Sequence, residues 1–137
     1  IIPLALEVAS GRSTHFEING GDYETSDGTC IRDYIHVIDL SYAHLLALKK
    51  VFNYKASEFI NLGGAKGSSV KEIISLVKKI TGKKLNHKFS KRRKGDPPIL
   101  IAKILKAKNY LGWHPKNSNI SEIINDSWLW YKKYHQL

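Results

Sequence analysis

Residues 27–40 read DGTCIRDYIHVIDL, and this stretch decides the fold expected for the chain. It places a cation, Arg32, and a phenol, Tyr34, on one side of a segment that we expect to be extended over residues 34–37. It then reaches Asp39, a residue type that often caps the start of a helix. The apolar residues at helical spacing that follow are Leu40, Ala43, Ala47, Leu48 and Val51. The stretch therefore predicts an extended segment that runs directly into a helix.

The rest of the chain alternates helical and extended patterns. We expect further helices over residues 1–10, 70–82, 103–110 and 120–131, and strands over residues 15–18, 58–62 and 85–89. Ser69 and Glu72 form the capping box that begins one of these helices. This order predicts an α/β fold, or a mixed α+β one, in a single region over residues 1–137. The strand at residues 58–62 indicates a larger parallel sheet whose neighbouring strands are absent from this chain.

The net charge is +10 at pH 7, and it is concentrated in one region. Residues 71–108 hold 13 Lys or Arg side chains against two acidic ones, Glu72 and Asp96. Such a block is typical of proteins that bind nucleic acid, an anionic membrane or a phosphorylated small ligand. It is equally typical of a solvated lysine face, which we favour for most of these lysines.

Several classes of protein do not match the composition. No stretch approaches the ~20 apolar residues that cross a bilayer, so no membrane partner is expected. Cys30 is the only cysteine, so no internal disulfide can form, which fits a reducing cytoplasm. The six histidines lack metal-ligand spacing, so no metal is expected. No nucleophile is paired with a base in the sequence, and we predict no catalytic residue.

Two arginines are the candidate binding residues, because a planar guanidinium can bind two phosphate oxygens at once. Arg32 is the first, although a local ion pair with Asp33 is the alternative. Arg93 is the second, and Gly95 and Asp96 follow it in a loop that ends in two prolines. A carboxylate accepts hydrogen bonds from ligand hydroxyls. Together these residues suit a ligand with a pyrophosphate and a sugar or a base.

Four motifs, in order, resemble the C-terminal portion of the UDP-glucose 4-epimerase family, which belongs to the extended short-chain dehydrogenase/reductases. Residues 27–40 are similar to D-G-T-x-x-R-D-Y-I-H-V-x-D-L, and residues 61–70 to N-L-G-x-x-x-G-x-S-V. Residues 92–98 are similar to R-R-x-G-D-x-P, and residues 111–113 with 128–130 to L-G-W and W-x-W. The resemblance covers nearly the whole chain.

The resemblance implies part of an NAD-dependent isomerase that interconverts UDP-glucose and UDP-galactose. It implies that residues 1–137 form the substrate-binding region, together with elements that complete an NAD-binding Rossmann domain. Arg32 and Arg93 match positions that hold the pyrophosphate, and Asp96 matches one that meets the ribose hydroxyls. The other matched pocket positions are Tyr34, Val70, Glu17 and Asn19.

Two parts of the family pattern are missing. The chain has neither G-x-G-x-x-G nor Y-x-x-x-K, so the resemblance implies that it is inactive alone and needs an NAD-holding N-terminal domain as its partner. Asn19 stands where an aromatic residue is usual, and Leu100 stands where residue size gates acetylated hexosamines. The resemblance implies that the helix over residues 39–51 and the strand over residues 58–62 would face the missing NAD-binding Rossmann half. We therefore expect exposed apolar surface there, with self-association or a homodimer as its outcome.

Two other functions stay open. A related nucleotide-sugar dehydratase or decarboxylase would share most of these motifs. A basic nucleic-acid-binding module is the less favoured alternative, since residues 83–94 interleave cations with His87 and Phe89. That stretch has no recognition-helix pattern and no zinc ligands, so nucleic acid is not an expected partner.

Overall fold

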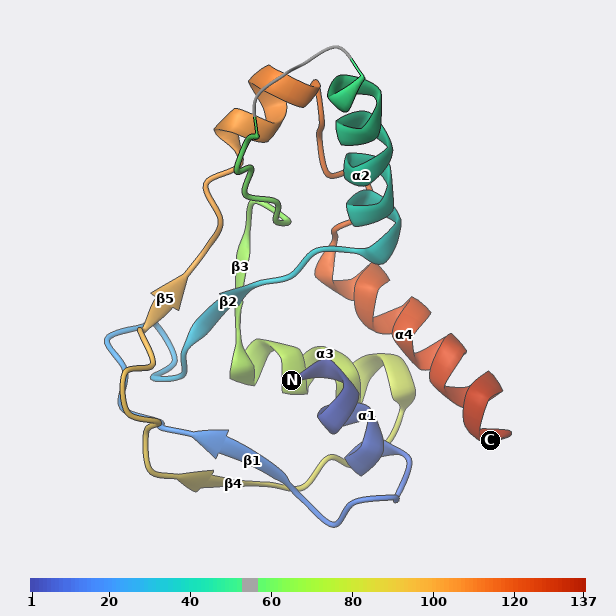
Figure 1. Ribbon diagram of the computed structural model, residues 1–137. Helices are drawn as coiled ribbons and strands as arrows, with labels where there is room; N and C mark the ends of the chain where they lie inside the picture. The colour runs from blue at the N-terminus through green and yellow to red at the C-terminus, as the bar shows by residue number, and fades with distance from the viewer. Residues whose placement is uncertain (53–56) are drawn as a thin grey trace.

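The structure is a computed structural model and describes residues 1–52 and 57–137. Figure 1 shows two groups of elements, one at the top and one at the bottom of the view, joined by a short sheet and by the last helix. Helices and strands of both orientations are present, as predicted for an α/β or mixed α+β chain.

The lower group holds the larger hydrophobic core. α1 (Ile2–Ala9), α3 (Val70–Thr81) and α4 (Ile120–His135) pack against one another. β1 (Phe16–Asn19) pairs in parallel with β4 (His87–Ser90) below them (Figure 1). The apolar side chains of these elements form one cluster, whose fully buried members include Leu6, Ile18, Ile73, Val77 and Ile124.

The upper group is smaller and is built around Trp113. α2 (Val37–Val51) contacts η1 (Ala107–Leu111), which is a π-helix. Trp113 is fully buried in the cluster that these elements share. Its indole Nε1 donates a hydrogen bond of 2.9 Å to the main-chain oxygen of Asp39, so the side chain ties the first turn of α2 to the segment after η1.

A three-stranded sheet lies between the two groups. β2 (Ile31–Asp33) is central, with β3 (Gly67–Ser69) antiparallel on one side and β5 (Ile99–Leu100) parallel on the other. The sequence pattern did not predict these strands. They are very short, and β3 consists of Gly and Ser, which have low strand propensity on their own, so pairing with distant residues is what makes them strands.

α3 has the start and the end that the sequence predicts. The Ser69 hydroxyl accepts a hydrogen bond of 3.1 Å from the Glu72 N–H, and the Glu72 carboxylate accepts one of 3.3 Å from the Ser69 N–H. Gly82 ends the helix in the left-handed conformation, with φ of 66°, which costs glycine little. The buried stripe of α3 is Val70, Ile73, Ile74 and Val77.

The start of α2 differs from the prediction. The residue that caps this helix is His36 and not Asp39: the imidazole Nδ1 accepts a hydrogen bond of 3.1 Å from the Ile38 N–H. Asp39 lies within the first turn, and its carboxylate binds a distant segment instead. The expected extended stretch at residues 34–37 is also shifted, because β2 ends at Asp33 and Val37 is already helical.

Two other expectations need correction. Residues 58–62 form no strand in the part of the chain that the structure describes, since no described strand pairs with them, and a strand requires hydrogen-bonded neighbours. The helix expected over residues 103–110 is a short turn followed by η1, although Gly112 ends it as predicted, with φ of 67°.

Apolar side chains are exposed along α2, as the sequence predicts. Only Asp39 and Ala43 are buried on this helix, whereas Val37, Ile38, Leu45 and Val51 are exposed. Phe59, within residues 58–62, is 92% exposed. None of the helices in the described residues combines the length and the apolar character that spanning a bilayer requires.

Candidate functional site

Six of the seven predicted site residues line one cavity of about 450 Å³. The cavity is bordered by α1, β1, β2, the start of α3 and the connection between β4 and β5. The six residues are Glu17, Asn19, Arg32, Val70, Arg93 and Asp96. Residues that are far apart in the sequence therefore meet at one place, which is what a binding site for a single ligand requires.

β2 and its neighbours fix the position of Arg32. Arg32 lies opposite Ser68 of β3 and Leu100 of β5, so its backbone is held from both sides. Val70 follows β3 directly, and its N–H donates a hydrogen bond of 3.3 Å to the Cys30 oxygen. The central strand and the start of α3 thus form one wall of the cavity.

Arg32 forms its ion pair with Asp96, not with the adjacent Asp33. Its Nη2 contacts Asp96 Oδ1, and its Nη1 donates a hydrogen bond of 2.7 Å to the Ile31 oxygen. The side chains of Arg32 and Asp96 are 17% and 28% exposed, so water screens this pair less than a surface pair. The alternative of a local pair with Asp33 is therefore wrong.

The two adjacent arginines after β4 have different surroundings. Arg93 lines the cavity, in a turn in which the Asp96 N–H donates a hydrogen bond of 3.2 Å to the Arg93 oxygen. Arg92 is not among the cavity residues. Its Nε donates a hydrogen bond of 2.7 Å to Asp22, and its guanidinium lies 4.4 Å from the centre of the Tyr23 ring.

Glu17 and Asn19 lie on the strand next to the cavity. The Phe16 N–H donates a hydrogen bond of 2.8 Å to the Asn86 oxygen, just before β4, and the Gly20 N–H donates one of 2.9 Å to the Ser90 oxygen in β4. In a parallel pair alternate residues bond the neighbour, so the main-chain groups of Glu17 and Asn19 face away from β4. Both residues line the cavity, and no described strand pairs with this edge of β1.

Tyr34 is the one predicted residue that is not in the cavity lining. Its hydroxyl is buried and has no hydrogen-bond partner among the residues that the structure describes. Burial, which disfavours the phenolate, raises the pKa of Tyr34 to about 12. The group is therefore a neutral hydroxyl at physiological pH, able to donate a hydrogen bond.

Three aspartates at intervals of six residues hold distant segments around the site. Asp27 accepts a hydrogen bond from Ser69, the cap of α3. Asp33 accepts hydrogen bonds from the N–H groups of Gly64 and Ala102, at 2.8 and 3.0 Å. Asp39 accepts from the segment 116–118. These carboxylates in residues 27–40 are therefore structural, and Arg32 lies among them.

Sequence reasoning missed part of the lining. Glu7, His15 and Cys30 also border the cavity, and Cys30 is a buried free thiol. No motif marks Glu7 or His15, because each reaches the cavity only through the packing of α1 and the segment after it against β1. Cys30 lies within residues 27–40, two residues before Arg32. This closeness to a predicted binding residue was the one signal in the sequence that could have placed Cys30 at the cavity.

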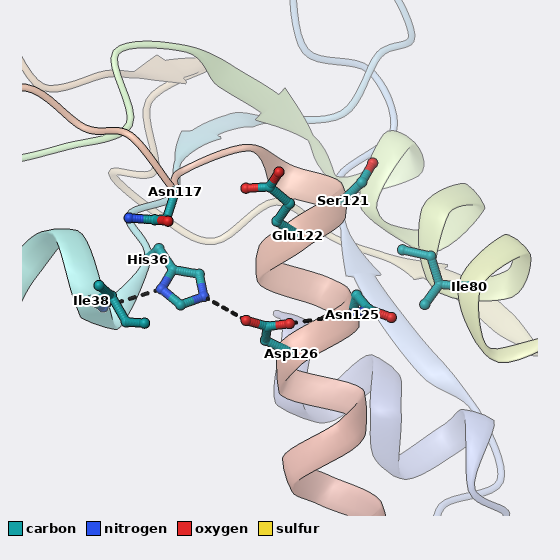
Figure 2. A pocket seen from close by; sticks show the side chains of 8 residues that line it. All are labelled: His36, Ile38, Ile80, Asn117, Ser121, Glu122, Asn125 and Asp126. Carbon is teal, nitrogen blue, oxygen red and sulfur yellow. Dashed lines mark hydrogen bonds and ion pairs between the residues drawn. The ribbon is translucent and has the colours of Figure 1, made fainter.

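A second hollow of about 540 Å³ lies between the start of α2, α3 and α4, and Figure 2 shows its lining. His36 points across it toward Asp126, with 3.3 Å between Nε2 and Oδ2. Since Nδ1 accepts from the Ile38 N–H, the proton lies on Nε2. The lining of this hollow contains no arginine or lysine, whereas the cavity described above contains both predicted arginines, Arg32 and Arg93.

A family model described as GDP-mannose 4,6 dehydratase matches residues 1–127. The chain belongs to this family. Its likeness to UDP-glucose 4-epimerases is also confirmed: that of Halalkalibacterium halodurans is 43% identical over 134 residues, which are 98% of this chain and 40% of the relative. The matched portion of these relatives is C-terminal, and the chain spans about 40% of their length.

Solved structures agree with this membership. The UDP-glucose 4-epimerase from Stenotrophomonas maltophila, with bound NAD and formylated UDP-arabinopyranose, has a TM-score of 0.92 at 34% identity, covering 98% of this chain and 40% of that one. The UDP-Glc/GlcNAc 4-epimerase from Campylobacter jejuni has a TM-score of 0.86 at 41% identity, covering 96% and 40%. The likeness in fold therefore extends over nearly all of this member of the family.

Proposed function

We propose that this chain is the UDP-sugar-binding part of a UDP-glucose 4-epimerase, which in complete form interconverts UDP-glucose and UDP-galactose. The observation that carries the proposal is the meeting in one cavity of Arg32 with Arg93 and Asp96, and Asp96 lies 64 residues beyond Arg32 in the sequence. Two guanidinium groups suit the two phosphates of a nucleoside diphosphate, and a carboxylate suits the hydroxyls of its ribose.

The edge of β1 gives a physical account of how a uracil would be held. Uracil presents one N–H between two carbonyl oxygens. A main-chain carbonyl at Glu17 or Asn19 can accept a hydrogen bond from the uracil N–H, and the main-chain N–H groups of these residues can donate to the uracil oxygens. Asn19 replaces an aromatic side chain of the family pattern, which removes stacking worth about 1–3 kcal/mol but leaves these hydrogen bonds available.

Val70 completes the proposed contacts. Val70 contributes an apolar part of the wall beside Arg32. Tyr34 does not line the cavity and packs against the large hydrophobic core, so we propose for it a role in supporting the site and not in contacting the ligand.

The chain cannot hold NAD by the usual glycine-rich turn, because its sequence contains no G-x-G-x-x-G. We therefore assign NAD to a preceding N-terminal domain, and we expect the chain alone to be inactive. The exposed apolar face of α2 is the surface that we assign to that domain. A single, buried, unpaired cysteine supports a reducing compartment, and we place the activity in the cytoplasm.

The neighbouring arginines provide a matched test of this proposal. We expect the chain to bind UDP weakly, because half of the cleft is missing, with chemical-shift changes at Asn19 and Val70 in an NMR titration. Arg93→Gln removes a cavity cation and is expected to weaken binding about tenfold or more. Arg92→Gln removes the same charge outside the cavity and is expected to change it less than about twofold.

Equal effects of the two substitutions would contradict the proposed site, because binding would then depend only on overall charge. Sub-micromolar affinity of the chain for UDP-glucose, measured by calorimetry, would contradict the assignment of half of the cleft to another domain.

A further inference from the structure

His36 lies at the joint between the two groups of elements, at the point where α2 begins. The residue is 6% exposed, and each of its nitrogen atoms has a partner. The imidazole Nδ1 accepts a hydrogen bond of 3.1 Å from the Ile38 N–H, and Nε2 lies 3.3 Å from Asp126 Oδ2 (Figure 2). The main-chain N–H donates a hydrogen bond of 3.0 Å to Ser118 Oγ. One buried residue thus connects the first turn of α2 with α4 and with the segment before α4.

The two contacts of the ring depend on protonation in opposite ways. Nδ1 can accept from the Ile38 N–H only while the imidazole is neutral, because the imidazolium carries a proton on both nitrogens. Nε2 donates to Asp126 in both forms, and in the imidazolium this contact becomes an ion pair. Protonation of the ring therefore removes the cap of α2 and strengthens the contact with α4.

The titratable groups around the ring come from two helices. α4 presents the carboxylates of Asp126 and Glu122 on one side of the ring and the phenol of Tyr131 on the other, and α2 adds Asp39 in its first turn. The residues that line the same two hollows from α1 and α3 are apolar: Pro3, Leu6 and Ile80. The carboxylates attract an imidazolium, whereas the positive end of the α2 dipole repels it.

We propose that His36 is a proton-operated switch at this joint. The neutral ring holds the start of α2, and the protonated ring releases the Ile38 N–H and holds Asp126 of α4 instead. Histidine is the side chain whose charge ordinarily changes between pH 5 and 8. The inference goes beyond the proposed function, since none of these three residues lines the ligand cavity. The switch acts on α2, the helix whose exposed apolar face we assign to the NAD-holding domain.

NMR spectroscopy of the 137-residue chain between pH 8 and pH 5 tests the switch directly. The ¹⁵N shifts of the imidazole report which nitrogen carries a proton, and we expect Nε2 alone at pH 8 and both nitrogens at pH 5. Over the same range, the protection of the Ile38 amide from hydrogen exchange, corrected for its intrinsic rate at each pH, is expected to fall about fivefold. That is the effect of losing one helix cap.

Three variants separate the two contacts of the ring. His36→Asn keeps a cap acceptor but cannot titrate, so the protection of the Ile38 amide is expected to stay constant with pH. His114→Asn, at an exposed position, is the matched control and is expected to retain the wild-type fall. Asp126→Asn leaves the cap but removes the partner of the imidazolium, so the fall is expected to move to lower pH.

Each readout has an outcome that overturns the switch. A proton on Nδ1 at pH 8, a ring that stays neutral at pH 5, or constant protection of the Ile38 amide while the ring titrates would each do so. These three observations come from the wild type, so they stand even if a variant does not fold. A fall in His36→Asn equal to that of the wild type would assign the effect to another group. An unchanged midpoint in Asp126→Asn would show that Asp126 does not hold the imidazolium.

Discussion

Asp39 illustrates how one residue can be misjudged from its neighbours in the sequence. Its position after an extended segment is typical of a helix cap, yet its carboxylate accepts hydrogen bonds of 2.6–3.1 Å from Lys116, Asn117 and Ser118. Those partners lie more than seventy residues away. The local pattern correctly predicts a polar residue at the start of α2, and it contains no information on which segment the carboxylate binds.

The Asp39 network leads to a prediction about stability. Burial raises the pKa of Asp39, but the hydrogen bonds from Ser118, Asn117 and Lys116 outweigh it and hold this pKa below its ordinary value. The stabilising effect is therefore complete above the unfolded-state pKa of about 4 and is lost as pH falls through the lower folded-state pKa. Asp39→Asn is expected to cost about 3 kcal/mol at pH 7.

Urea unfolding of the wild type and Asp39→Asn between pH 7 and pH 2 measures this effect. The difference in unfolding free energy is expected to shrink as the pH falls below about 4. Glu24→Gln, which removes an exposed carboxylate, provides the control. A difference that stays constant with pH would mean that the Asp39 carboxylate is not the stabilising species.

At the scale of elements, prediction succeeded where the interacting residues are close in sequence. The capping box of α3 lies within four residues, and its apolar stripe repeats within one helix, so both are readable from the sequence. β2, β3 and β5 depend on pairs such as Arg32 with Leu100, which no local pattern encodes. The six cavity residues were found by their match to family motifs and not by local patterns. The motifs do not say which side chains pair with one another, so the Arg32–Asp96 ion pair was not predicted.

The cap of α3 can be tested with two serines of one helix. Ser69→Ala removes the acceptor for the Glu72 N–H and also the donor to Asp27, so we expect a loss of about 2 kcal/mol in unfolding free energy. Ser75→Ala, at an exposed position within α3, is expected to change stability by less than about 0.5 kcal/mol. Similar losses for both, measured by chemical denaturation, would contradict the role of the cap.

At the scale of the whole molecule, α2 is apolar on two sides. One side packs with η1 and Trp113, and the other leaves Ile38, Leu45 and Val51 exposed. Exposed apolar surface of this kind usually marks an interface. Under the proposed function we assign this face to an NAD-holding domain, and without that domain it remains open to a second copy of the chain.

Sedimentation velocity measures this tendency. We expect the wild-type chain to self-associate and the double variant Ile38→Lys, Leu45→Lys to sediment as a monomer, because two charges seven residues apart interrupt one face of α2. Leu129→Lys, at a comparably exposed site on α4, is expected to leave the association unchanged. A monomeric wild type would show that the exposed apolar face of α2 does not drive self-association of the chain.

The opposite surroundings of Arg92 and Arg93 constrain how this region can change. Arg92 is held on the outer surface by Asp22 and Tyr23, and the very next residue supplies the cavity cation. Loss or gain of a single residue between β4 and Gly95 would exchange their places or leave neither in position. We therefore expect this connection to tolerate substitutions better than insertions or deletions. Its length is constrained more strictly than its amino-acid composition.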